Sequence, residues 1–303
     1  MHSKRNTFTR TLFAMFAIST LFTISMMVAA GDAGSGWMGR VADTTSLADL
    51  SIPGTHDSCA LHEPLPGTAQ CQKLSIAEQL NAGVRFLDIR CCNTGETFTI
   101  YHGIYSEGMT FNQVVAAVTA FLKAHPTESV IMSVKEENSN TGSAFNTVFQ
   151  SYVKRNPGIW YLGTTVPILG EVRGKIVLFR RCNGACGIDA SVWPDDTAFK
   201  NGVLMVEDNY KVDGSAAKWT AVISHLNSAK ADISHSLFMT FSSGYTSGMF
   251  GLPNIINVST DVNSRLSDYF KTSKVGHYGI IPMDFADASH CLQIISTNAS
   301  LSK

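Results

Sequence analysis

The chain has 303 residues, of which 45% are hydrophobic and 16% are charged, so it can bury a core as one large domain. Its formal net charge of −1 provides no general attraction for polyanions. Composition and charge argue against a disordered chain and against a basic nucleic-acid-binding protein, so we expect no nucleic-acid partner.

The first 30 residues differ in composition from the rest. Three basic residues precede an apolar run over residues 11–28, and small residues follow at 29–31. This pattern is typical of an export signal. An uncleaved membrane anchor is the alternative, because the run approaches the roughly 20 apolar residues that a spanning helix needs. We therefore expect a signal peptide over residues 1–30, a single domain over residues 31–303 and a secreted protein.

All the cysteines lie after this segment. They are Cys59, Cys71, Cys91, Cys92, Cys182, Cys186 and Cys291. An exported chain meets oxidising conditions, so we expect disulfides with one thiol left over. A bridge among the first four is possible, and Cys182 with Cys186 could close a small loop. The paired Cys-x-x-Cys spacing of zinc knuckles does not occur in the sequence, which argues against a structural zinc site.

Short β-branched or apolar runs alternate with helical patterns along the domain. Strands are predicted over residues 50–52, 85–89, 98–101, 129–134, 175–179, 203–206, 237–241 and 279–283. Helices are predicted over residues 76–82, 111–124, 144–155, 216–230 and 291–299. Thr110 is a suitable N-cap for the second of these helices, and Pro126 is a stop signal just beyond its end.

Alternating strands and helices predict parallel βα units, and eight strands favour closure into a barrel. Only about eight residues separate the second and third strands, which is too short for a helical crossover. We therefore predict an α/β fold: a single irregular TIM-type (β/α)8 barrel. A doubly wound open sheet is the alternative.

Polar residues gather where the predicted strands end, which is where parallel barrels place their reacting groups. His56 and Asp57 follow the first strand, Asp88 and Arg90 end the second, and His102 ends the third. The later strands end at Lys135, Glu137, Arg181, Asp208, Tyr210 and Asp284.

This set of side chains is suited to the cleavage of a phosphate ester. Two histidines can share acid and base catalysis, because an ordinary imidazole pKa near 6.5 lets one be neutral while the other is protonated. Arg90 supplies a permanent positive charge for phosphate oxygens. A carboxylate behind each histidine would fix its tautomer, and Asp57 and Asp284 are the candidates.

Four of the later polar residues also have a structural interpretation. Lys135 and Arg181 could be solvated surface charges, and Asp208 with Tyr210 could form a structural hydrogen bond. The sequence pattern alone does not decide between these roles.

Seven ordered runs of the sequence resemble the catalytic X-type domain of bacterial-type phosphatidylinositol-specific phospholipase C. They are LSIPGTHDS, AGVRFLDIR, IYHG, SVIMSVKEE, KIVLFRR, VEDNYKV and GIIPMDF. The resemblance extends from Leu47 to Ile295. It implies a barrel enzyme that cleaves phosphatidylinositol to diacylglycerol and inositol 1,2-cyclic phosphate.

Carried over by motif, the resemblance assigns a role to each residue. His56 would be the base that deprotonates the inositol 2-hydroxyl, and Asp284 would orient it. His102 would be the acid that protonates the leaving oxygen, with help from Asp57, while Arg90 would hold the phosphate. The inositol ring would be bound by Lys135, Arg181, Asp208 and the stacking ring of Tyr210.

Arg90 also bears on the question of a metal. The resemblance implies a carboxylate at this position in calcium-dependent relatives, because calcium needs oxygen ligands. An arginine repels a cation and can replace its charge, so we predict no metal and no cofactor. Two other functions remain open: a catalytically inactive inositol-lipid headgroup binder, and a metal-dependent phosphodiesterase acting on glycerophosphodiesters or sphingomyelin.

Two segments bear on binding to membranes. Compared with the family that the chain resembles, residues 59–75 are shorter than in the bacterial enzymes and lack the tryptophan-bearing helix that those use on membranes. The run SSGYTSGMFGLPN places Tyr245, Met249, Phe250 and Leu252 in a glycine-rich loop, which suits insertion into a lipid interface. Packing under the barrel rim is the alternative. We expect a monomer that transiently binds membranes containing phosphatidylinositol or a glycosylphosphatidylinositol.

Overall fold

The computed structural model describes residues 34–273 and 275–298. The signal peptide predicted over residues 1–30 lies outside these ranges. Within them, no helix combines the length and the apolarity that a membrane span requires.

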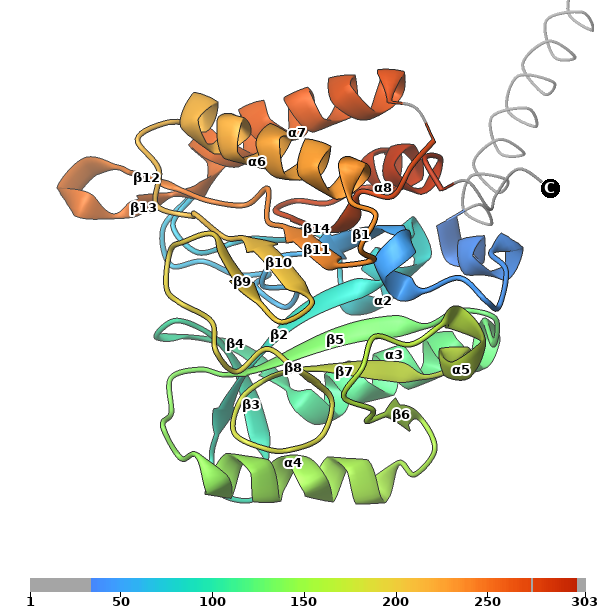
Figure 1. Ribbon diagram of the computed structural model, residues 1–303. Helices are drawn as coiled ribbons and strands as arrows, with labels where there is room; N and C mark the ends of the chain where they lie inside the picture. Colours follow the sequence, from blue (N-terminus) through green and yellow to red (C-terminus); the bar gives the residue numbers. More distant parts are fainter. Residues whose placement is uncertain (1–33, 274, 299–303) are drawn as a thin grey trace, which may run out of the picture.

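A curled, mostly parallel sheet forms the centre of the molecule (Figure 1). Its strand order is β6-β7-β5-β2-β1-β14-β11-β10-β9, in which the β9–β10 pair is antiparallel. The strands are β1 (Ser51–Thr55), β2 (Phe86–Asn93), β5 (Val130–Glu136), β6 (Trp160–Tyr161), β7 (Ile176–Arg181), β9 (Phe199–Asn201), β10 (Leu204–Glu207), β11 (Leu237–Thr240) and β14 (Gly279–Met283). Every residue of β1, β11 and β14 is buried, as expected for strands covered on both faces.

The fold is the predicted irregular barrel. Among the described strands, no pairing joins the two ends of the strand order, so hydrogen bonds do not close the barrel there. The short strand β8 (Ile188–Asp189) extends the sheet beside β7. A separate two-stranded ribbon is formed by β12 (Thr246–Ser247) and β13 (Pro253–Asn254), and it projects from the body of the molecule in Figure 1.

The third predicted strand is not a barrel strand. Strand β3 (Phe98–His102) pairs antiparallel with the end of β2 and with β4 (Tyr105–Thr110), and so forms a hairpin. The physical reason is the short connection after β2, which allows an antiparallel turn but no helical crossover. Gly103 has φ +55° in the turn that follows His102, a conformation that glycine adopts without strain.

Helices flank the curled sheet, with α3 and α4 below it and α6, α7 and α8 above it in Figure 1. The predicted helices are confirmed to within a few residues. They are α2 (Ile76–Ala82), α3 (Phe111–Ala124), α4 (Ser143–Arg155), α6 (Ser215–Ala231) and α8 (Ala288–Ile295). Short 3₁₀ turns cover Trp37–Arg40, Leu47–Asp49 and Met249–Gly251.

Two helices were not predicted: the short α5 (Leu169–Val172) and the long α7 (Ile255–Thr272). The buried side chains of α7 recur at helical spacing, which is a signal that the sequence does carry. They include Ile255, Val258, Val262, Leu266 and Phe270.

Helix ends follow from local sequence. The side chain of Ser75 accepts a hydrogen bond from the Glu78 N–H at the start of α2, and Gly83 ends this helix with φ +115°. Thr110 precedes α3, and the Gln113 side chain accepts a hydrogen bond from its backbone N–H at 2.8 Å. The predicted N-cap and the stop before Pro126 are both confirmed.

A buried ion pair lies at the amino ends of the strands. Arg85, just before β2, and Glu128, just before β5, are both fully buried, and Nη2 and Oε2 are 2.7 Å apart. Glu128 also accepts hydrogen bonds from the N–H groups of Met38 and Gly39. The pair thereby ties the start of the described chain to the base of the barrel.

The cysteines are free thiols in this structure, so the expected disulfides are not formed in it. Cys59 packs in the main core, whereas Cys71 packs in a smaller cluster with Ala60 and Ile255. The two thiols therefore lie in different apolar surroundings. Cys182 and Cys186 are half-buried and unbridged.

Candidate active site

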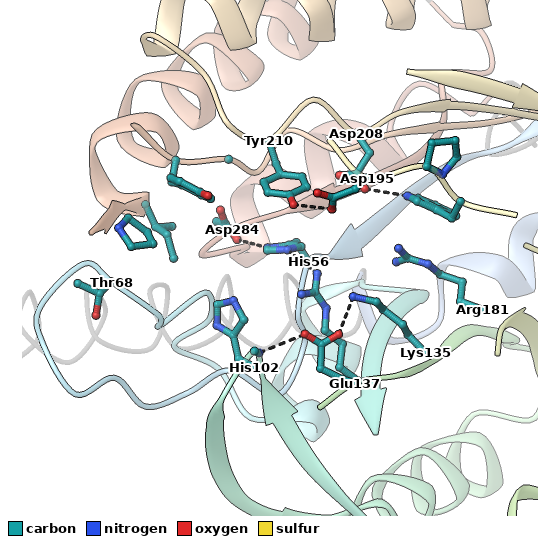
Figure 2. Close-up of a pocket in the computed structure, with 18 residues that line it drawn as sticks. His56, Thr68, His102, Lys135, Glu137, Arg181, Asp195, Asp208, Tyr210 and Asp284 are labelled. Carbon is teal, nitrogen blue, oxygen red and sulfur yellow. Dashed lines mark hydrogen bonds and ion pairs between the residues drawn. The ribbon is translucent and has the colours of Figure 1, made fainter. Parts of the chain in front are cut away.

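A cavity of about 370 Å³ opens at the carboxyl ends of the strands (Figure 2). Eight of the nine predicted site residues line it, namely His56, Arg90, His102, Lys135, Arg181, Asp208, Tyr210 and Asp284. The ninth, Asp57, is fully buried beside Arg90 and His102. The structure thus brings the whole predicted set together.

Neighbouring strands position the first histidine and its carboxylate. His56 follows β1 and Asp284 follows β14, and these strands pair in parallel, so the two side chains meet. His56 Nδ1 lies 2.8 Å from Asp284 Oδ1. The next residue after each, Asp57 with φ +37° and Phe285 with φ +50°, is in the left-handed region, which costs about 1 kcal/mol or more. Such strain is characteristic of functional sites.

The environment of His56 favours a base. Burial lowers the pKa of His56, but the charge and the hydrogen bond of Asp284 outweigh this and raise the pKa above its ordinary value of 6.5. With the Nδ1 proton donated to Asp284, Nε2 carries the lone pair, and Arg90 Nη2 lies 2.9 Å from it. Neutral His56 can therefore accept a proton at Nε2.

The second histidine comes from the hairpin. His102 Nδ1 is 2.7 Å from the Ala69 carbonyl oxygen, so this nitrogen carries a proton, and Nε2 lies 3.6 Å from Asp57 Oδ2. Neither carboxylate oxygen of Asp57 has a hydrogen-bond partner among the described residues, although Arg90 Nε is within 3.3 Å. Asp57 is thus the carboxylate that pairs with His102.

The two imidazole rings are neighbours. Their centroids are 6.4 Å apart and the ring planes are at 88°. Figure 2 shows both rings at the cavity, with Asp284 beside His56. A phosphate group held by Arg90 would therefore be within reach of both rings.

Asp88 is a member of the site to which the sequence analysis gave no role. It is fully buried, and its two oxygens contact Arg90 at 3.2 Å and Arg181 at 3.5 Å. Burial acts to raise the pKa of Asp88, but the charges of Arg90 and Arg181 hold it well below its usual range. Asp88 and Arg90 are two residues apart on β2 and so share one face of the strand, a signal that could have identified this pair.

Arg181, Asp208 and Tyr210 line one wall of the cavity, which we call the far wall. The segment between β8 and β9 also contributes to this wall, and the sequence did not predict it. The guanidinium of Arg181 stacks over the Trp193 ring at 3.8 Å, and Trp193 Nε1 donates to Asp208 at 2.9 Å. Tyr210 donates its hydroxyl to Asp195 at 2.6 Å. Trp193 and Asp195 lie in irregular structure, where no periodic pattern marks a site residue.

Several exposed apolar side chains are close in sequence to residues that line the cavity. Phe250 is 92% exposed and Leu252 is 40% exposed, so these two do not pack under the barrel rim. Leu65 and Ile104 are also exposed. Each of the four is within three residues of a cavity-lining residue, namely Thr68, Gly103 or Pro253. We refer to Leu65, Ile104, Phe250 and Leu252 as the mouth cluster. Tyr245, by contrast, lines the cavity itself.

Comparison with known proteins identifies the relationship. The family profile described as "Phosphatidylinositol-specific phospholipase C, X domain" matches residues 49–182, the part that carries both histidines and Arg90. This segment of the chain is therefore similar to the X domain of that phospholipase C family. Asp208, Tyr210 and Asp284 lie beyond the matched range, yet they line the same cavity.

Sequence similarity to bacterial phosphatidylinositol phosphodiesterases extends over most of the chain. The 1-phosphatidylinositol phosphodiesterase of Staphylococcus aureus (strain Newman) is 29% identical over 275 residues, which cover 82% of this chain and 88% of the relative. The enzyme of the same name from Listeria monocytogenes is 29% identical over 277 residues, 86% of this chain and 84% of that one.

Solved phospholipase C structures match the fold. A structure of the S. aureus phosphatidylinositol-specific phospholipase C superposes with a TM-score of 0.78 at 27% identity, covering 89% of this chain and 99% of that one. The Listeria monocytogenes structure has a TM-score of 0.76 at 25% identity, covering 88% and 98%. These matches confirm the barrel fold class.

Proposed function

We propose that this protein cleaves phosphatidylinositol to diacylglycerol and inositol 1,2-cyclic phosphate without a metal ion. One observation carries the proposal: two neighbouring imidazoles, each beside its own carboxylate, lie with Arg90 in one cavity. An inactive headgroup binder has no need of both an acid and a base. The similar proteins from S. aureus and L. monocytogenes are named 1-phosphatidylinositol phosphodiesterases.

In the proposed reaction, His56 is the general base. Its Nε2 removes the proton of the inositol 2-hydroxyl, and the resulting oxygen attacks the phosphorus. Asp284 keeps the other proton on Nδ1 and stabilises the imidazolium that forms. Arg90 withdraws from Nε2 to the phosphate oxygens and balances the charge that develops on them.

His102 is the proposed general acid. Its Nε2 donates a proton to the diacylglycerol oxygen as the bond from phosphorus to that oxygen breaks. Asp57 Oδ2 lies 3.6 Å from this nitrogen and is the carboxylate that assists the acid. Each proton transfer typically contributes about 10² to 10⁴ in rate.

The far wall is the proposed inositol site. Arg181, Lys135 and Asp208 are placed to bind ring hydroxyls, and Tyr210 offers a ring face. Each lysine or arginine that lines the cavity already has a carboxylate partner, since Lys135 pairs with Glu137, Arg181 contacts Asp88, and Arg90 contacts both Asp57 and Asp88. No spare positive charge is left among these cations for further phosphates, which favours the unphosphorylated lipid or a glycosylated anchor as substrate.

Transient membrane binding is proposed for the mouth cluster. Its exposed apolar side chains lie within three residues of positions that line the cavity, so they are available to contact a lipid surface near it. One solved S. aureus phospholipase C comes from work on the modulation of its membrane binding.

We also propose that residues 1–30 direct export and are then removed. The mass of protein recovered from the culture medium tests this, because a mass equal to that of the full-length chain would contradict removal.

The deciding experiment incubates purified protein with phosphatidylinositol vesicles in a chelator and follows the products by phosphorus NMR. A five-membered cyclic phosphate is expected, and His56→Ala and His102→Ala should each lower the rate by about 10²-fold or more. Vesicles containing phosphatidylinositol 4-phosphate should react much more slowly. Loss of activity in the chelator would favour a metal-dependent phosphodiesterase, and binding without turnover would favour an inactive headgroup binder.

A further inference from the structure

A buried thiol lies behind the proposed base and takes no part in the mechanism. Cys71 is fully buried and does not line the cavity. Its sulfur, a ring nitrogen of His56 and a carboxylate oxygen of Asp284 all lie within 4.8 Å of one another. The thiol donates a hydrogen bond to the Ala69 carbonyl at 3.5 Å. Among the described residues, this is the one group of imidazole, thiol and carboxylate ligands with such spacing.

The backbone holds Cys71 firmly against the strands that carry the other two ligands. The Cys71 carbonyl accepts a hydrogen bond from the Phe285 N–H at 2.7 Å, next to Asp284. The side chain of Gln72 donates to the carbonyls of His56 and Met283, both at 2.8 Å. The three ligands are therefore positioned by the fold, with no mobile side chain required to assemble them.

We propose that His56, Cys71 and Asp284 form a binding site for zinc or a similar thiophilic divalent cation, which inhibits the enzyme by capturing its base. Imidazole, thiolate and carboxylate together suit zinc, whereas calcium and magnesium prefer oxygen ligands alone. Ile255 and Ala60 pack around Cys71, so the thiol side of the site is apolar, whereas His56 and Asp284 face the cavity.

The geometry needs only a small adjustment. Tetrahedral zinc with bonds of about 2.0 to 2.3 Å separates its ligand atoms by about 3.3 to 3.6 Å. The present gap of 2.8 Å between His56 Nδ1 and Asp284 Oδ1 would have to open by about 0.5 Å to meet that spacing. Water can provide the fourth ligand.

Inhibition follows from the position of the protons. The cation replaces the thiol proton of Cys71, which leaves to solvent, and binds the Nδ1 lone pair of His56. The single remaining proton of the neutral imidazole must then sit on Nε2, so this atom can no longer accept one. Arg90, whose Nη2 donates to Nε2 in the metal-free state, must also move away. The inhibition rests on the proposed function, whereas the binding does not.

The test compares wild type with Cys71→Ser, using full-length protein freed of metal. Cobalt(II) serves as the spectroscopic probe, because a cobalt–thiolate bond produces a charge-transfer absorption. Wild type should show this absorption and should lose phospholipase activity on titration with zinc but not with magnesium. Cys71→Ser should keep its activity, lose the absorption and be inhibited by zinc at least about tenfold more weakly.

Cys291→Ser is the matched control, because Cys291 is also a fully buried free thiol but lies outside the group. It should behave like wild type. Unchanged zinc inhibition or a retained cobalt–thiolate absorption in Cys71→Ser would overturn the proposal, as would a wild type that shows neither. If Cys71→Ser does not fold, Cys71→Ala takes its place, with folding checked by circular dichroism. If the protein lacks phospholipase activity, the cobalt spectrum still decides whether the site exists.

Discussion

Asp284 and Asp57, the two carboxylates beside the histidines, have different roles because their contacts differ. Asp284 is hydrogen bonded to His56 at 2.8 Å, and its charge is the largest influence that raises the pKa of this imidazole. Asp57 has no hydrogen-bond partner among the described residues and lies 3.6 Å from His102. Asp284 therefore sets the proton affinity and the tautomer of the proposed base, while Asp57 supplies charge to the acid.

Asp284→Asn tests this assignment. The base must be neutral to act, and Asp284 raises the pKa of His56, so activity in wild type falls as the pH drops through a value above 6.5. Loss of the charge should lower that pKa and move the acidic limb of kcat/KM to lower pH, with kcat reduced by about 10²- to 10⁴-fold through loss of the correct tautomer.

The matched control for this substitution is Asp287→Asn. Asp287 pairs with His290 Nδ1 at 2.8 Å, which is the same chemistry outside the cavity. It should leave the pH profile unchanged. An acidic limb that stays in place in Asp284→Asn would argue against Asp284 as the carboxylate that tunes the base.

At the scale of elements, the irregular parts of the barrel build the mouth of the site. The β3–β4 hairpin delivers His102 and exposes Ile104 at its turn. The β12–β13 ribbon carries Phe250 at its tip, where φ +59° holds the backbone in the left-handed region. An exposed aromatic ring on a strained tip is consistent with contact to a lipid surface.

Phe250→Ser should weaken binding to phosphatidylinositol vesicles and spare hydrolysis of a soluble substrate. Burying a phenylalanine side chain contributes about 1.5 to 3 kcal/mol, so the vesicle affinity should fall by roughly 10- to 100-fold in a sedimentation assay. Ile233→Ser is the control, since Ile233 is 93% exposed but precedes β11 at the opposite end of the barrel. Equal losses on both substrates would refute a membrane role for Phe250.

Across the whole molecule, the residues of the proposed active site and a buried ion pair that supports the fold lie at opposite ends of the barrel. The cavity lies at the carboxyl ends of the strands, whereas the Arg85–Glu128 pair lies at the amino ends, fully buried. Arg85 also donates hydrogen bonds to the carbonyls of Leu80, Val84, Gly34 and Ser35. The pair thus joins a helix end, a strand and the N-terminal part of the described chain.

Glu128→Gln should destabilise the fold without altering the chemistry. Removing one partner leaves the buried guanidinium uncompensated, which typically costs about 3 to 5 kcal/mol of unfolding free energy. Urea denaturation measures this, and kcat of the remaining folded protein should be unchanged. Asp261→Asn, which breaks an exposed pair with Arg265, should cost about 1 kcal/mol or less. A similar small cost for both variants would show that the buried pair is not a main support of the fold.

The sequence by itself determined the local structure and the chemistry at the strand ends. Periodicity and caps predicted α2 and α3 to the residue, and the ordered motifs named His56, Arg90 and His102. These features are encoded by neighbours in the chain, so one sequence suffices to find them.

Only the tertiary structure decided how distant residues meet. It placed β3 in a hairpin, tied Asp88 to two arginines, brought Trp193 and Asp195 to the cavity wall and set Cys71 behind His56. The physical reason is that such contacts depend on strand order and on irregular loops, which no local period specifies. His56 and Asp284 are 228 residues apart in the chain, and the parallel pairing of β1 with β14 makes them neighbours.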